Sequence, residues 1–314
     1  MVYTPLKNWI YVFHMPLFFF LSGYLFRFDR HPNFMPFVRR RFRQLMCPYI
    51  VINLVTFAFW ALVSRNMGAE TDDTPLWDPL LAACLGNGPD MVHDVPLWFL
   101  MCLFEVECIY HLVFRHRTTF QRLLLALGFA LVGWANYRFN PIMLPFSFGT
   151  TLVAVVFYAL GHEAHRIRRH PHPLWAVGAC VVTIGVGYAN GRINMHRNYY
   201  ADYALFFLGA LAGILMMMTL CREGNRHLPE RVKKGMRFVA RHTLFICGYQ
   251  FLAFSFINGA LFYGFQFCTS RLEEKILGPF LLALAATALC LLGAEIQQRS
   301  IAWWQKRHGI GRIF

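Results

Sequence analysis

The chain has 314 residues, of which 57% are hydrophobic, 17% are aromatic and only 15% are charged, and its net charge is +14. A soluble domain usually carries about 25% charged residues, so this composition excludes an ordinary soluble enzyme, a disordered chain and a disulfide-stapled secreted domain. It favours a membrane protein with several spans.

Nine segments are long and apolar enough to cross a bilayer core of about 30 Å. Residues 45–63, for example, contain no acid or base. The nine segments predict an all-α, polytopic bundle of about nine transmembrane helices, folded as a single membrane-embedded domain over residues 1–314. In chain order, the predicted spans are 9–26, 45–64, 95–114, 121–137, 142–161, 174–190, 202–221, 243–263 and 277–296.

The basic residues alternate between rich and poor loops. Of the 30 Lys and Arg residues, 23 lie in loops 27–44, 115–122, 162–173 and 222–242 and after residue 297, and 7 lie in the other loops. Bases concentrate in cytoplasmic loops, so we expect a multi-pass protein of the cell membrane with the N-terminus outside and the C-terminus in the cytoplasm. Such loops also contact anionic lipid. We therefore expect a lipid bilayer, and no nucleic acid, as a partner.

The first predicted span contains His14, its only strongly titratable side chain, followed by Pro16 and an aromatic run. An ionisable residue at membrane depth is costly and is a candidate for function. The alternative is a histidine that makes a hydrogen bond at the membrane interface. Ser22 and Gly23, near the end of this span, would allow a neighbouring helix to approach closely.

An arginine-rich loop follows, with six arginines and no lysine in residues 27–44. Arg40 and Arg43 are three residues apart, so a helix would place them on one face. Planar guanidinium groups suit phosphate oxygens, which favours a phosphate-bearing ligand on the cytoplasmic side. The alternative is a topology anchor without a ligand.

The third span holds Glu105 and Glu107, the two carboxylates deepest in any predicted span, and Trp98 lies two helical turns before Glu105. Two residues apart on a helix, the carboxylates point to nearly opposite faces. Either one could act as a base or orient an imidazole. A hydrogen-bonded structural role is the alternative.

A later loop groups His162, Glu163 and His165 with several arginines in residues 162–173. The arginines oppose a cation, so we expect no metal site. Motifs for nucleotide hydrolysis, dinucleotide binding and hydrolase chemistry are missing from the sequence.

Three strings of the sequence resemble the acyltransferase family 3 membrane proteins, especially the bacterial sugar O-acetyltransferase and fucose 4-O-acetylase-like branch. The strings are His14–Gly23, the Arg40-x-x-Arg43 pair before Pro48-Tyr49, and Pro96-Leu97-Trp98-Phe99-Leu100, with weaker similarity at 157–161 and 240–246. Together they extend from about residue 9 to residue 255.

The resemblance implies an integral-membrane O-acyltransferase that moves an acyl group, usually acetyl, from acyl-CoA to a hydroxyl of a cell-envelope sugar or glycan. It implies that the acyl-CoA is a donor substrate and not a permanently bound cofactor. We expect Arg40 and Arg43 to hold the donor phosphates, His14 and Glu105 to supply catalysis, and Trp98 and Ser22 to contact substrate.

The sequence departs from the family pattern at its start. The family has ten spanning helices, and the arginine and histidine of its first helix have no counterpart here. We therefore expect the ten-helix fold without its first helix. A histidine of a late family helix is replaced by Gln250. Two alternatives remain, a non-catalytic truncated member and a transporter or flippase of a lipid-linked sugar, although no internal repeat supports a transporter.

Overall fold

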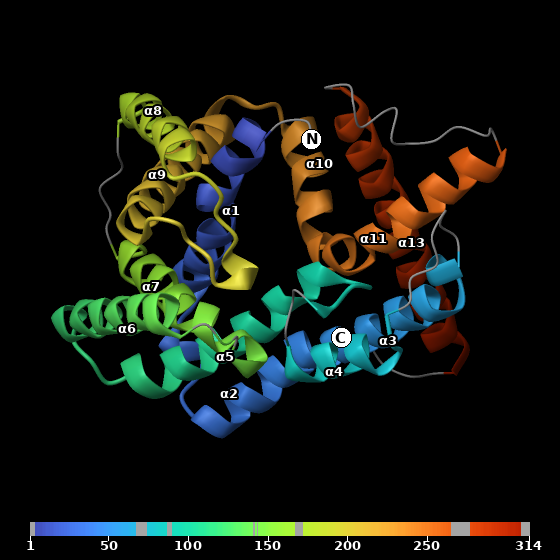
Figure 1. Cartoon of the computed structure of the whole chain (residues 1–314), viewed down its shortest axis with the longest axis horizontal. Helices are drawn as coiled ribbons and strands as arrows, with labels where there is room; N and C mark the ends of the chain where they lie inside the picture. Colours follow the sequence, from blue (N-terminus) through green and yellow to red (C-terminus); the bar gives the residue numbers. More distant parts are fainter. Residues whose placement is uncertain are drawn as a thin grey trace. The chain divides into compact units, whose positions relative to one another are not determined.

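The computed structural model describes residues 4–66, 74–86, 90–140, 142, 144–166, 172–264 and 277–308. Within these ranges no β-strand forms, and an isolated bridge joins Asn194 to Tyr199. The all-α prediction is confirmed. The α-helices are α1 (Thr4–Leu25), α2 (Phe34–Arg41), α3 (Cys47–Leu62), α4 (Trp77–Leu85), α5 (Trp98–Phe114), α6 (Thr119–Phe139), α7 (Phe148–Ala164), α8 (Leu174–Ala189), α9 (Tyr203–His227), α10 (Glu230–Arg241), α11 (Thr243–Gly259) and α13 (Leu277–His308) (Figure 1).

A helix lies at each of the nine predicted spans. Among the described residues, six helical segments are long and apolar enough to cross a membrane. Helices α1, α6 and α8 fall outside this group, so the number nine stays a prediction. The six segments are Phe34–Leu62, Val95–Phe114, Pro145–Ala164, Tyr203–His227, Thr243–Gly264 and Gly278–Ser300.

Short helices also form in segments that the sequence analysis treated as loops. These are α2, α4 and α10. A π-helical turn, η2 (Phe42–Met46), joins α2 to α3. Helices α9 and α13 also extend well past the predicted ends of their spans.

The chain divides into two compact units, which we describe separately. The large unit contains Tyr3–Asn53 and Thr74–His227, and the small unit contains Met1–Val2, Leu54–Asp73 and Leu228–Phe314. The prediction of a single domain is not tested by this division.

The core of the large unit forms around α7, which packs against α1, α5 and α6, while α1 also packs against α8 and α9 (Figure 1). Helices α1 and α7 touch backbone to backbone. A Cβ on Gly23 would lie 2.0 Å from the carbonyl oxygen of Tyr158, and one on Gly161 would lie 2.0 Å from that of Phe20. These two glycines therefore permit the close packing that the Ser22–Gly23 pair predicted.

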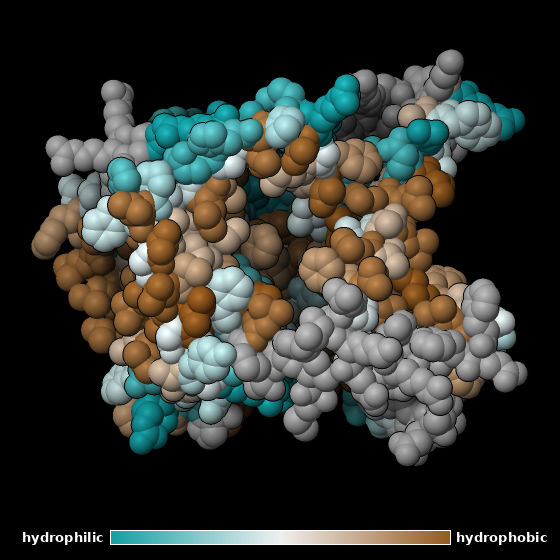
Figure 2. All heavy atoms as spheres, turned by 90° about the horizontal axis from the view of Figure 1, so that it is seen from above, coloured by the Kyte–Doolittle hydropathy of each residue, from teal (hydrophilic) through white to brown (hydrophobic). Residues whose placement is uncertain are grey.

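The outward faces of the helices carry large apolar side chains. On α8, for example, Leu174, Trp175, Val177 and Val181 are each more than 60% exposed. Figure 2 shows hydrophobic surface over much of the face in view, with hydrophilic residues gathered near its edges. A soluble protein rarely exposes continuous apolar surface of this extent, so these faces suit lipid.

In the small unit, α11 packs against α13. Ala253 meets Ala286 and Cys290 in a core of small side chains, with Phe245 and Tyr249 packed beside it. At one end of this pair the side-chain amide of Gln298 lies 3.1 Å from Nε2 of His242.

Candidate functional site

The arginine segment, residues 39–43, contains a change in helical geometry. Helix α2 ends at Arg41, and the π-helical turn η2 follows at once. Single π turns are rare and occur often at functional sites. Arg40 and Arg43 therefore flank the junction of an α turn and a π turn, and the regular α-helical spacing that the sequence argument assumed is not kept.

The side chain of Arg41, which lies between these two residues in the sequence, is directed at α5. Its Nε lies 2.8 Å from Oε2 of Glu107, in an ion pair whose side chains are 25% and 3% exposed. Its guanidinium also donates to Oε1 of Gln44 at 3.0 Å and lies over the ring of Phe37. Glu107 is thus a structural partner, which fixes the arginine segment to α5.

Arg40 and Arg43 are both exposed, and neither side chain forms a hydrogen bond or ion pair with the described part of the chain. Their charges are therefore available to a ligand. Burial, followed by the guanidinium groups of Arg41 and Arg40, lowers the pKa of the neighbouring His31. A histidine that stays neutral leaves the positive charge of the site to the arginines.

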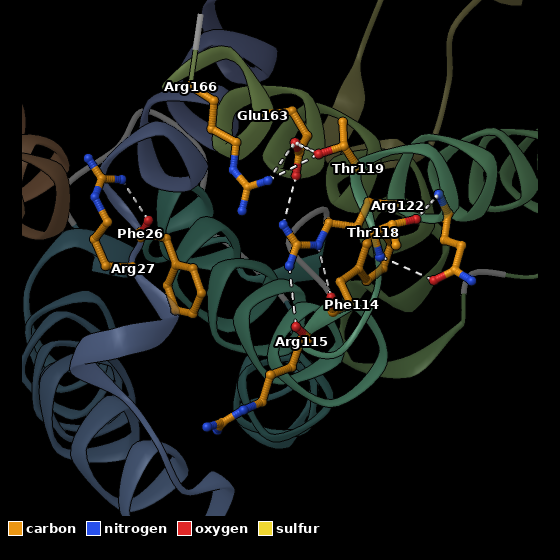
Figure 3. Close-up of polar contacts among 10 residues, drawn as sticks. Phe26, Arg27, Phe114, Arg115, Thr118, Thr119, Arg122, Glu163 and Arg166 are labelled. Carbon is orange, nitrogen blue, oxygen red and sulfur yellow. Dashed lines mark hydrogen bonds and ion pairs between the residues drawn. The ribbon is translucent and has the colours of Figure 1, made fainter.

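A buried polar cluster joins the end of α5, the start of α6 and the end of α7 (Figure 3). Arg122 of α6 donates to Oε1 of Glu163 at 2.9 Å and to the carbonyl oxygens of Phe114 at 3.0 Å and Arg115 at 3.2 Å. The hydroxyl of Thr119 donates to the other oxygen of Glu163 at 2.9 Å. Arg122 thus ties the end of α5 to the end of α7.

Glu163 and His162, from the predicted histidine-rich loop, lie within this packed end. The carboxylate of Glu163 is occupied by Arg122, Thr119 and Arg166, and the ring of His162 packs among aromatic rings such as that of Phe28. Within the described ranges, no three His, Cys, Asp or Glu side chains are grouped as metal ligands would be. His170, Arg168 and Arg169 lie outside the described residues.

Glu105 faces α7, away from Glu107, as the helical spacing predicted. Oε2 of Glu105 accepts a hydrogen bond from the hydroxyl of Thr151 at 2.8 Å, and the side chain is half-buried. Trp98, two turns earlier, is buried, and its ring centroid lies 6.3 Å from that of His196. Burial, with Arg197 and Arg192 nearby, lowers the pKa of His196 to about 4, so this imidazole is neutral at pH 7.

The bonds of His14 define its tautomer. Its Nδ1 lies 3.0 Å from the carbonyl oxygen of Ile10, and a carbonyl oxygen can only accept, so Nδ1 carries the proton. In the neutral ring Nε2 then has a free lone pair, which is what a base requires. Ser22, in the same helix, donates to the carbonyl oxygen of Phe18 at 2.9 Å.

The six predicted site residues thus fall into three groups. Arg40 and Arg43 lie at the junction of α2 and η2, Glu105 and Trp98 lie on α5, and His14 and Ser22 lie on α1. The hydrogen bonds of the described residues do not join His14 to Glu105, so the two are not an acid–base pair in this structure. Sequence reasoning missed the role of Arg41 because its partner is 66 positions away along the chain.

The apolar helices and their exposed hydrophobic faces define a multi-pass helical membrane protein. A family model of the acyltransferase domain matches residues 3–295, so the chain belongs to acyltransferase family 3. The match covers most of the chain and confirms the family resemblance seen in the sequence. No curated protein and no solved structure is detectably similar to the chain.

Proposed function

We propose that this protein is an O-acyltransferase that transfers an acyl group, acetyl in the simplest case, from acyl-CoA to a hydroxyl of a cell-envelope sugar or glycan. Membership of acyltransferase family 3 supports the reaction class. The arrangement of basic loops supports a cell-membrane location with the arginine segment and the C-terminus in the cytoplasm, where acyl-CoA is found.

The observation that carries the proposal is the contrast among adjacent arginines. Arg41 is used in the ion pair with Glu107, whereas Arg40 and Arg43 are exposed and unpaired among the described residues. Fixing one guanidinium holds its neighbours in position. Coenzyme A carries several phosphates, and guanidinium groups bind phosphate oxygens through charge-assisted hydrogen bonds. The donor binds and leaves in each cycle, and no permanently bound cofactor is required.

The reaction needs a base and a leaving group. The base removes the hydroxyl proton of the sugar, the oxygen attacks the thioester carbonyl, the C–S bond breaks and coenzyme A leaves as the thiol after taking up a proton. His14, with its Nε2 lone pair free, is suited to accept the first proton. We assign Glu105, which is not bonded to His14, a separate acid–base role, and we assign Trp98 and Ser22 to substrate contact.

The donor site is tested by Arg40→Ala and Arg43→Ala in membranes incubated with radiolabelled acetyl-CoA, with the protein expressed from its whole open reading frame. Loss of a hydrogen bond to a charged group costs about 1.5–3 kcal/mol, so each variant should weaken donor binding about tenfold or more. Membrane insertion should be unchanged, because the other bases still set topology.

Arg39→Ala is the matched control, since Arg39 is exposed in the same turn of α2. It should transfer acetyl normally. Unchanged donor affinity in both test variants would reduce the motif to a topology anchor. Donor binding without transfer to any glycan would indicate a non-catalytic member of the family.

A further inference from the structure

A pocket of about 180 Å³ opens in the large unit, away from the arginine segment, where three chain segments meet. It is lined by Tyr137 from α6, Asn140 just after α6, Thr150 from α7, and Arg197, Asn198 and Tyr199 from the loop before α9. Pockets that enclose drug-sized ligands measure roughly 300–1,000 Å³. This one is smaller and suits a ligand the size of a single ring.

Residues with strained backbone conformations are concentrated at this pocket. Four non-glycine residues of the described chain have positive φ, namely Phe146, Ser147, Asn198 and Ala201, with φ values between 50° and 62°. Ser147 and Asn198 line the pocket. Phe146 is adjacent to Ser147, and the carbonyl of Ala201 accepts a hydrogen bond from Tyr137 at 3.0 Å. Strained backbone persists where surrounding structure enforces it, and it clusters at binding and active sites.

Unused hydrogen-bonding capacity lies beside the pocket. Oδ1 of Asn198 and Nδ2 of the nearby Asn136 are buried and have no hydrogen-bond partner among the described residues. Gly149 leaves room for these amides, because a Cβ there would lie 2.7 Å from Nδ2 of Asn136 and 3.1 Å from Nδ2 of Asn198. Buried polar atoms are rarely left unpaired, so these amides point to a polar ligand.

The chemistry of the lining matches a sugar ring. A pyranose has an apolar C–H face and an edge of hydroxyls, and the tyrosine rings and asparagine amides offer contacts of both kinds. Arg197 is exposed at the pocket, and its side chain forms no hydrogen bond or ion pair with the described residues. Thr150 lines the pocket, and its neighbour Thr151 donates to Glu105. The pocket and the carboxylate assigned to catalysis are therefore connected through the first turn of α7.

We propose that this pocket binds one pyranose ring of the acceptor glycan, with Tyr199 against the ring face and Asn198 bonded to its hydroxyls. The identity of the acceptor rests on the proposed function. The two lining loops are among those poor in bases, so both are expected outside the cell, and α7 runs from Thr150 to the cluster around Glu163 near the arginine segment. Acceptor and donor would thus approach from opposite ends of one helix.

Sugar binding is measured without acyl transfer, by saturation-transfer NMR on the detergent-solubilised protein. The probes are methyl glycosides of glucose, galactose, mannose, fucose and N-acetylglucosamine, with glycerol as a polyol control. Asn198→Gly removes the amide and keeps the φ of 50° accessible. Asn198→Asp keeps the side-chain shape, and Tyr199→Ala removes the ring. Tyr188→Ala, on a 72% exposed side chain of α8, is the control.

We expect at least one glycoside to bind the unaltered protein and Tyr188→Ala equally, and to bind each pocket variant at least tenfold more weakly. Binding that is equal in all variants, or absent for every glycoside, would overturn the proposal. Acetyl transfer that the pocket variants leave unchanged would also overturn it while leaving the acyltransferase function intact. Glycoside binding through Asn198 without any acetyl transfer would keep the pocket and count against the acyltransferase.

Discussion

Asp94, just before α5, is fully buried, and neither carboxylate oxygen has a hydrogen-bond partner among the described residues. Burial raises the pKa of this carboxyl from 3.8 to about 8. The unfolded chain loses the proton above pH 4, whereas the folded chain keeps it until about pH 8. The folded state therefore binds more protons in this window, and stability should fall as the pH rises from 4 to 8.

Asp94→Asn should remove this pH dependence. A difference of one pKa unit corresponds to about 1.4 kcal/mol of stability, and the pKa of Asp94 is raised by more than one unit. At pH 8 we therefore expect the free energy of unfolding of the variant to exceed that of the unaltered protein by more than about 1.4 kcal/mol. Thermal unfolding in detergent between pH 5 and 8.5 measures the effect. Asp90→Asn, on an exposed side chain of the same loop, should keep the original profile, and a parallel profile for Asp94→Asn would contradict the argument.

Arg41 and its neighbours show how similar side chains take different roles. Breaking a buried ion pair by removing one partner leaves an uncompensated charge, which is strongly destabilising. The Arg41–Glu107 pair is therefore expected to be a fixed part of the fold, whereas Arg40 and Arg43 remain free to bind and release a ligand. Arginine residues that are adjacent in sequence can thus be separated into structural and functional groups only by their partners.

At the scale of helices, the contact between α1 and α7 depends on Gly161. Alanine normally stabilises a helix relative to glycine by roughly 0.5–1 kcal/mol, but here its Cβ would lie 2.0 Å from a backbone oxygen of α1. Overpacking typically costs about 1–3 kcal/mol, and backbone atoms yield less than side chains. Gly161→Ala should therefore lower the thermal unfolding midpoint markedly.

Gly178→Ala supplies the comparison. A Cβ at Gly178, in α8, would meet nothing within 4 Å, so its thermal midpoint should stay the same or rise. Equal midpoints for the two alanine variants would mean that the α1–α7 contact can separate without cost.

Helix α10 has one apolar and one basic face. Val232, Met236 and Val239 recur at helical spacing and are each about 40% exposed or more. The other face carries five basic residues, and two of them, Lys233 and Arg237, lower the pKa of Glu230. Such a helix is expected to lie in the interface of a membrane with anionic lipid, and its place in the chain between the apolar helices α9 and α11 supports this.

Hydrogen exchange of the segment Glu230–Arg241 in lipid nanodiscs tests this placement. Protection should be greater with phosphatidylglycerol than with phosphatidylcholine alone. Met236→Glu should abolish the protection, and Met236→Leu should keep it. Lys234→Gln should reduce only the part that depends on anionic lipid. Protection that is identical in both lipids would refute an anionic-lipid contact.

The long helices could be predicted from sequence because each apolar run is itself the signal. Helix α10 was not predicted, because its charges were interpreted only as a topology signal. The helical spacing of Val232, Met236 and Val239 could have revealed it. The Arg41–Glu107 and Arg122–Glu163 pairs join residues far apart in the chain, so spacing alone could not reveal them. The strained backbone at Ser147 and Asn198 also depends on tertiary packing, and neither residue is a glycine that would mark it.

At the scale of the whole molecule, sidedness decides whether both proposed sites can work. Donor and acceptor sites on opposite faces require that α6, α7 and α8 each cross the membrane, yet α6 and α8 are not among the six described helical segments that are long and apolar enough. Each failed crossing would reverse the side of every later loop. The alternation of 23 against 7 basic residues predicts that all of them cross.

Cysteines introduced one at a time at exposed positions near the ends of α6, α7 and α8 test these three crossings separately. We expect His116→Cys and His172→Cys to react with an impermeant maleimide only after permeabilisation, and Arg138→Cys and Arg192→Cys to react in intact cells, relative to the parental protein. A label near Asp72 should likewise react outside, and a tag after Phe314 should lie inside, although both positions lie outside the described residues. If positions 116 and 138 reacted on the same side, α6 would not cross. The pocket around Asn198 and the arginine segment could then not serve opposite faces of the membrane.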